Sequence, residues 1–135
     1  MSRSRLAPVT LWLAAAAFAG PGLAFLVAPG LLGLVDLAPT TATARSDARA
    51  VFGGLELGLA VFLAACARRP AAHPAGLLAA ALAFGGLAAG RLLSLAVDGV
   101  PRVLTFSLWV PEILGCALTV TALRRETRGR VAPAD

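Results

Sequence analysis

The sequence predicts an all-α integral membrane protein, a four-helix bundle with both chain ends in the cytoplasm (N-in/C-in). Of its 135 residues, 59% are hydrophobic, and the 14% that are charged fall in clusters between long apolar runs. The mean hydropathy is +0.83. A soluble domain of this length could not bury so much apolar surface. We therefore expect the apolar runs to lie in lipid, as one membrane domain over residues 1–135.

Four apolar runs are long enough to cross a bilayer, which takes about 20 helical residues. The expected spans are residues 6–27, 47–67, 76–97 and 103–123. Pro21 should kink the first span because it removes a backbone donor. Arg3, Arg5 and the stretch Ala17-Phe18-Ala19, which resembles a small-residue cleavage site, also fit a cleaved signal peptide. The apolar run continues to Val27, however, which favours a retained span.

The loops predict the orientation. Residues 28–46 form a connector with a short apolar stretch, which we expect to lie in the membrane interface. Arginines in short loops are held on the cytoplasmic side. Eight arginines fall on one side of the expected spans, namely Arg3, Arg5, Arg68, Arg69, Arg124, Arg125, Arg128 and Arg130. Three fall on the other side, Arg45, Arg49 and Arg102, so eight against three predicts the N-in/C-in arrangement.

Several function classes are not expected. The net charge of +5 would suggest nucleic-acid binding in a soluble protein, but here the arginines bracket apolar segments. His73 is the single histidine, and Cys66 and Cys116 form no CxxC pair, so we expect no metal site. No phosphate-binding or dinucleotide-binding glycine motif occurs either. The sequence therefore predicts no cofactor.

A Phe-Gly-Gly-Leu repeat occurs at residues 52–55 and again at residues 84–87. With the glycines that follow, it gives two GxxxG pairs, Gly54/Gly58 and Gly86/Gly90. Such pairs let helix backbones approach closely in lipid, so we interpret them as packing positions. The alternative is an inverted-repeat transporter, although transporter repeats normally contain several helices each.

Three ionisable residues lie inside the expected spans: Glu56, Arg91 and Glu112. Each would cost about 2.5–3.5 kcal/mol at the bilayer centre, so all three should face the bundle interior. Counting from the outer helix ends at 1.5 Å per residue places all three about 10–14 Å deep. We therefore expect them to share one level of the bundle, with Arg91 within pairing distance of Glu56, Glu112 or both.

These charges and their neighbours predict a pocket that opens to the outer side. Its expected residues are Arg49, Glu56, Arg91, Ser94, Asp98, Trp109 and Glu112. Pro111 should bend the fourth helix beside this pocket, because it leaves a carbonyl unbonded. The expected pocket holds two deep carboxylates but one deep guanidinium, so one carboxylate would lack a full partner. Glu56 and Glu112 are therefore the candidate proton carriers or catalytic groups. The structural alternative is an ion-pair network that only specifies helix packing.

Short motifs link the sequence to a known family. They are Asp47-x-Arg49-Ala-Val-Phe52-Gly53-Gly54, Gly90-Arg91, Asp98-Gly99-x-Pro101 and Glu112. On these motifs the chain resembles a bacterial family of small four-helix membrane proteins that is a domain of unknown function, itself similar to the DoxX-like group. The resemblance implies a four-helix membrane bundle and carries Arg49, Gly53, Gly54, Arg91, Asp98 and Glu112 over as pattern positions.

The resemblance implies no specific activity. Some DoxX-like relatives are associated with quinone-linked oxidoreductase complexes, but this sequence has no haem, flavin or metal motif. Phe52 stands where the family pattern favours Tyr, and Pro111 before Glu112 departs from it.

The leading functional hypothesis is a bacterial inner-membrane protein whose pocket binds a lipid-like or quinone-like molecule, or an accessory subunit of a membrane complex. Alternatives are an intramembrane acid/base enzyme acting on a lipid substrate, and a small proton-coupled transporter. Membrane lipid is the expected surrounding partner, and the GxxxG faces would allow a homo-oligomer.

Overall fold

The computed structural model describes residues 5–131, and these are almost entirely helical, with no strand among them. Arg3 lies outside the described residues. The α-helices are α1 (Leu6–Val27), α2 (Ala42–Ala48), α3 (Glu56–Ala67), α4 (His73–Val97), α5 (Val103–Ser107) and α6 (Trp109–Val131). A π-helical segment, η2 (Arg49–Leu55), joins α2 to α3 without a break, and two 3₁₀ segments, η1 (Pro29–Val35) and η3 (Pro70–Ala72), lie in the connections.

Four of the described stretches are long and apolar enough to cross a membrane: Leu6–Val27, Ala42–Ala67, Pro70–Val97 and Val103–Arg128. The predicted all-α, multi-pass membrane class is therefore confirmed. The second stretch starts five residues earlier than the expected residue 47, because Thr41 caps α2. The Thr41 hydroxyl accepts the Ala44 N–H at 3.1 Å, which satisfies one of the free donors at the helix start.

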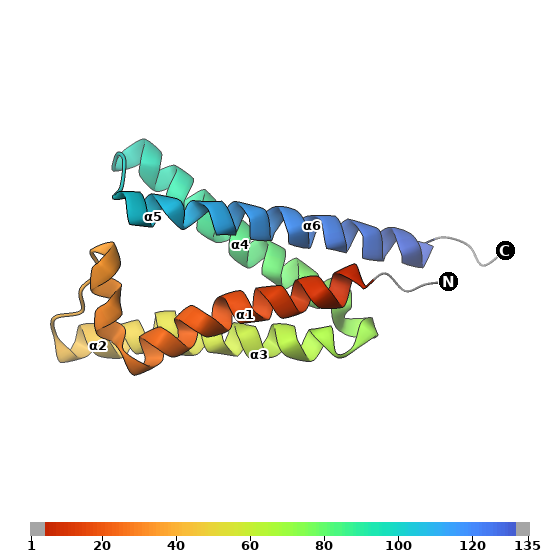
Figure 1. The fold of residues 1–135 in the computed structure, drawn as a ribbon, viewed down its shortest axis with the longest axis horizontal. Helices are drawn as coiled ribbons and strands as arrows, with labels where there is room; N and C mark the ends of the chain where they lie inside the picture. Colours follow the sequence, from red (N-terminus) through yellow and green to blue (C-terminus); the bar gives the residue numbers. More distant parts are fainter. Residues whose placement is uncertain (1–4, 132–135) are drawn as a thin grey trace.

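The helices form two pairs, one of α1 with α3 and one of α4 with α6 (Figure 1). The pairs meet at the end of the molecule where α1 begins, α6 ends and α3 turns into α4, here called the inner end. Leu11, Leu63 and Leu77 are fully buried there, and Phe18 stacks on Phe84 with ring centroids 4.9 Å apart. The start of α1 and the end of α6 lie together at the inner end, as an N-in/C-in topology requires. The assignment of this end to the cytoplasm stays a prediction from the arginines.

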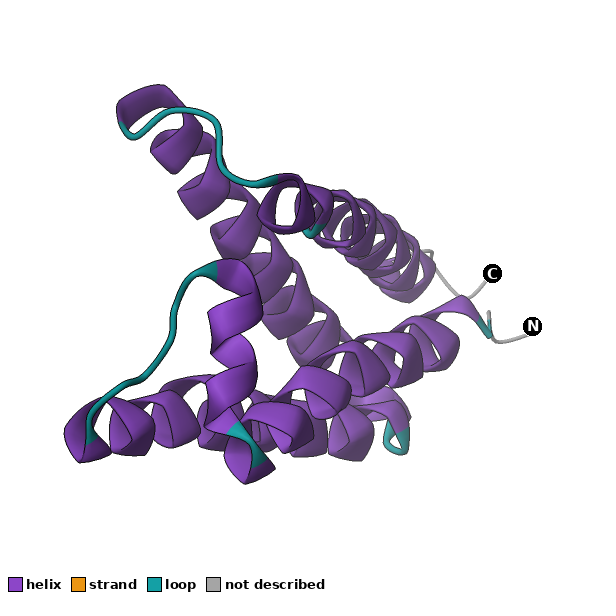
Figure 2. Ribbon diagram, turned by 60° about the vertical axis from the view of Figure 1, so that its left-hand side comes forward, coloured by secondary structure: helices purple, strands orange, loops and turns teal. Residues whose placement is uncertain are grey.

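The two pairs diverge toward the opposite, outer end, where η1 and α5 lie (Figure 2). An exposed ion pair links them there, between Arg102 Nη1 and Asp36 Oδ1 at 2.9 Å. Arg102 precedes α5, and Asp36 ends η1 in the left-handed conformation, with φ of 63°. The outer half therefore leaves polar side chains of both helix pairs outside the apolar core.

Backbones approach most closely at glycines outside the predicted GxxxG pairs. A Cβ added to Gly53 would lie 2.9 Å from both the Cα and the amide nitrogen of Leu26 in α1. A Cβ on Gly76 would lie 2.6 Å from the Cβ of Cys66. These are contacts that a side chain at either position could not avoid by rotating.

The four glycines of the GxxxG pairs lie elsewhere: Gly54, Gly58, Gly86 and Gly90 are all exposed. A Cβ on Gly54 would meet only a carbonyl of its own helix at 3.7 Å, and a Cβ on the other three would meet nothing within 4 Å. None of the four therefore packs against another described helix of this chain. Each copy of the repeat instead contributes its first glycine, Gly53 or Gly85, to a contact between helices.

Candidate functional site

The centre of the candidate site is an ion pair between α4 and α6. Arg91 Nε donates to both carboxylate oxygens of Glu112, at 2.9 Å to Oε1 and 2.8 Å to Oε2. Glu112 is 8% exposed, whereas the Arg91 side chain is 30% exposed. The prediction that the deep arginine pairs with a deep glutamate is confirmed for Glu112.

A helix break beside Glu112 shapes the wall of the site. The helix is interrupted at Leu108, between α5 and α6. Pro111 explains the break, because it has no N–H to donate to the Ser107 carbonyl four residues earlier. Beyond the break, Trp109 Nε1 donates to the Ala88 carbonyl at 3.1 Å, which holds α6 against α4. Phe106 lies edge-on to Trp109, with ring centroids 5.8 Å apart.

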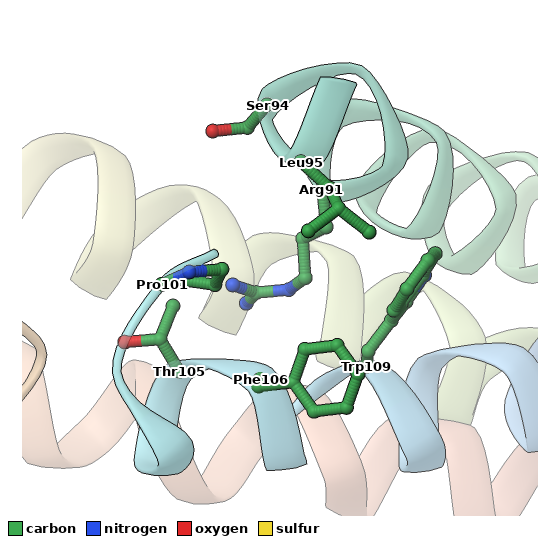
Figure 3. Close-up of a pocket in the computed structure, with 7 residues that line it drawn as sticks. All are labelled: Arg91, Ser94, Leu95, Pro101, Thr105, Phe106 and Trp109. Atoms are coloured by element: carbon green, nitrogen blue, oxygen red, sulfur yellow. The ribbon is translucent and has the colours of Figure 1, made fainter. Parts of the chain in front are cut away.

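A cavity of about 60 Å³ lies beside the ion pair, between the outer ends of α4, α5 and α6 (Figure 3). It is lined by Arg91, Ser94, Leu95, Pro101, Thr105, Phe106 and Trp109. The guanidinium end of Arg91 extends into the space between Pro101, Thr105 and Phe106. The cavity therefore combines one cationic donor group with mainly apolar and aromatic walls.

The predicted pocket residues separate into two groups. Arg91, Ser94 and Trp109 line the cavity, and Glu112 joins them through Arg91. Asp98 belongs to the same half, because the Ser94 hydroxyl donates to Asp98 Oδ2 at 2.8 Å. Both Ser94 and Asp98 are exposed. These five residues thus form one polar face of the α4–α6 pair.

Arg49 and Glu56 belong to the other helix pair. Arg49 Nε donates to the Leu26 carbonyl at 3.1 Å, one of the carbonyls left free at the end of α1. Glu56 is half-buried beside Gly22 of α1, and its carboxylate forms no hydrogen bond or ion pair with any described residue. The structure therefore does not join all seven predicted residues in one cluster.

The π-helical segment bears on the expected alignment of Arg49 above Glu56. Seven residues return to nearly the same face of an α-helix, which would place Arg49 directly above Glu56. The segment between them has π-type hydrogen bonding, with more residues in each turn. The seven-residue rule therefore does not hold across η2, and no pattern in the sequence indicated the change.

A second hollow, not predicted from the sequence, lies at the outer end. This open groove of about 500 Å³ runs between the connector and the helix formed by α2 and η2. It is lined by Leu32, Asp36, Leu37, Ala38, Pro39, Ala44, Asp47, Ala48, Val51 and Phe52. The apolar stretch of the connector was the one sequence feature that could have indicated this groove. How the connector packs against α2, however, depends on contacts that no local pattern predicts.

No three or more His, Cys, Asp or Glu side chains gather in a metal-binding arrangement within residues 5–131. His73 instead packs at the inner end, 7% exposed, with Nε2 3.3 Å from the Ala67 carbonyl. Cys66 and Cys116 are free thiols.

One comparison with known proteins gives a match. Residues 6–123, most of the chain, match the family described as Domain of unknown function (DUF4345). Comparisons with curated proteins and with solved structures gave no match. The chain, a four-helix membrane protein with a charged pair between α4 and α6, belongs to the DUF4345 family.

Proposed function

We propose that this protein binds an amphipathic molecule, lipid-like or quinone-like, at the cavity beside Arg91 and Glu112. The observation that supports this is the state of the Arg91 guanidinium. Its Nε binds Glu112, while Nη1 and Nη2 form no hydrogen bond within the described part of the chain. Their end of the side chain lies in the cavity (Figure 3).

Free donors at this depth need a partner. A guanidinium carries five N–H groups, of which the two Nη atoms hold four. Leaving such groups unbonded in an apolar medium costs several kcal/mol, on the order of 2–7 kcal/mol for one uncharged group. Acceptor oxygens on a bound molecule would satisfy them. The donor set thus favours a ligand whose polar head carries oxygen acceptors.

The size of the cavity favours an amphipathic ligand. Sites that enclose a whole small molecule measure about 300–1,000 Å³. This cavity, of about 60 Å³, has room only for part of a head group. The remainder of the ligand would lie outside it, against exposed apolar side chains such as Leu92 and Leu104. A head held by Arg91 with a hydrocarbon tail in lipid fits both conditions.

A second candidate function comes from the other helix pair. Glu56 is half-buried in a membrane-spanning helix and has no charged partner among the described residues. An unpaired intramembrane carboxyl is the kind of group that takes up or releases a proton in acid/base catalysis on a lipid or in proton-coupled transport. Loss of a pH-dependent activity in Glu56→Gln, with pocket binding unchanged, would favour this second function.

The proposal also includes the setting of the protein. We place it in the bacterial inner membrane, as a relative of the DoxX-like group that works alone or as an accessory subunit. The exposed glycines supply two small-residue surfaces through which two copies, or a partner subunit, would pack in lipid: Gly54 and Gly58 on η2 and α3, and Gly86 and Gly90 on α4.

Filling the cavity provides the test. Leu95→Trp should fill the cavity and exclude the head group, because Leu95 lines it. Leu93→Trp adds the same side chain at a position that is 66% exposed on the same helix, and it is the matched control. We expect mass spectrometry of gently purified protein to find one enriched amphipathic species with the wild type and with Leu93→Trp. That species should be absent from folded Leu95→Trp, and equal recovery from all three proteins would contradict the proposal.

A further inference from the structure

We infer that the cavity selects an electrically neutral, planar head group that carries a carbonyl oxygen. This inference rests on the proposed function and narrows the class of ligand. It follows from three features of the described residues, namely the charge balance around Arg91, the donors left free in the cavity and the form of its walls.

The charge balance disfavours an anionic head. Glu112 already neutralises Arg91 through both carboxylate oxygens. Arg102, next to the cavity residue Pro101, is paired with Asp36 at 2.9 Å. Asp98 adds a further carboxylate on the face of Arg91, and its hydrogen-bond partner is the neutral Ser94. A phosphate or carboxylate head would therefore bring negative charge to a surrounding that is already balanced or negative, whereas a neutral head would not.

The free donors specify an acceptor. Trp109 has used its single N–H on the Ala88 carbonyl, and Ser94 has used its hydroxyl hydrogen on Asp98. The Nη groups of Arg91 are the unbonded side-chain donors that extend into the cavity, whereas the Thr105 hydroxyl points away from the guanidinium (Figure 3). A carbonyl oxygen is a neutral acceptor with two lone pairs and can take two of these N–H groups.

The walls favour a flat group. Phe106 and Trp109 meet at 77°, so the ring of one stands nearly upright beside the ring of the other. Leu95 and the Pro101 ring complete the apolar lining (Figure 3). A planar conjugated head could stack on one of these rings while its carbonyl reaches Arg91. A quinone ring has this form, and a glycerol ester of a neutral lipid has the carbonyl but is not planar.

The chain's two tryptophans allow a direct test. Trp109 lines the cavity, whereas Trp12 lies at the inner end, where the Arg68 guanidinium lies over its ring. Trp12→Phe leaves Trp109 as the single reporter, and Trp109→Phe is the matched control. Both proteins are placed in phosphatidylcholine nanodiscs and titrated with decylubiquinone. We expect saturable quenching of Trp109 fluorescence and a non-saturable response from Trp12.

Two competitors separate the features of the head. Dioleoylglycerol is neutral but not planar, and dioleoyl phosphatidic acid is anionic. We expect neither lipid to relieve the quenching of Trp109 by decylubiquinone until it is present in at least tenfold excess over the quinone. The double substitution Arg91→Gln/Glu112→Gln removes both charges of the pair, so that none is left unpaired. Made in the Trp12→Phe background, it should weaken quinone binding at least tenfold.

The outcomes separate the inference from the proposed function. Phosphatidic acid that competes as well as the quinone would refute a neutral head, and dioleoylglycerol that does so would refute a planar one. In both cases binding at Arg91 would stand. If decylubiquinone gives no saturable quenching while a species sensitive to Leu95→Trp co-purifies, the neutral planar head is wrong and the site is real. If no such species co-purifies either, the proposed function itself fails.

Discussion

Replacing Arg91 by leucine is expected to lower the free energy of unfolding by about 3–5 kcal/mol, the range found when one member of a buried ion pair is removed. The reason is Glu112, which is 8% exposed and has both oxygens on Arg91 Nε. Without the guanidinium, a carboxylate would remain unpaired between two membrane helices. Unfolding in mixed micelles, titrated with sodium dodecyl sulfate and followed by circular dichroism, measures the loss.

The double variant Arg91→Leu/Glu112→Leu is the control for this prediction. It removes the isolated charge and replaces the pair by apolar side chains, a change that is often neutral in other proteins. It should therefore recover most of the stability that Arg91→Leu loses. Wild-type stability of the single variant would show that the pair does not stabilise the contact between α4 and α6.

Gly53→Leu is expected to lower the free energy of unfolding by about 3 kcal/mol, because it overpacks the contact between α1 and η2. This value is the upper end of the usual range for overpacking. A Cβ at this position would lie 2.9 Å from backbone atoms of Leu26, which cannot rotate away as a side chain could. The two segments would have to separate. Arg49 would then lose its hydrogen bond to the Leu26 carbonyl as well.

The neighbouring residue is the matched control for Gly53. A Cβ on Gly54 meets only a carbonyl of its own helix, at 3.7 Å. Gly54→Leu has the same change in helix propensity and volume but faces away from α1. In the same detergent titration, carried out on the monomer, its stability should therefore stay near the wild type. A larger loss in Gly54→Leu than in Gly53→Leu would contradict the packing described for η2.

The fold class was predictable because bilayer thickness requires a fixed length of apolar helix. Runs of about 20 apolar residues between arginine clusters therefore indicated four membrane helices. That Arg91 pairs with a deep glutamate was predictable for a related reason, since charges inside lipid must find one another. The choice of Glu112 over Glu56 was not predictable from the sequence. The helix break before Glu112 followed from Pro111, whose effect is local.

The remaining features depend on contacts between distant parts of the chain. The π-helical form of η2 accompanies the close contact of Gly53 with Leu26, which no local pattern indicates. The Arg102–Asp36 pair joins residues 66 apart, both in exposed connections. The seven predicted pocket residues were grouped by depth and helical phase alone. Neither quantity says which helices pair, and the pairing of α1 with α3 keeps Glu56 out of the Arg91 site.

If the Arg91–Glu112 site binds a ligand and does not only hold two helices together, Arg91→Gln/Glu112→Gln should separate the two roles. Two amides of similar reach then replace the pair and leave no charge unpaired. Unfolding and co-purified ligand are measured on the same preparations. We predict stability within about 1 kcal/mol of the wild type, as for exchange of both partners, together with loss of the ligand. A folded double variant that retains the ligand in full would contradict the binding role and leave the pair a packing element.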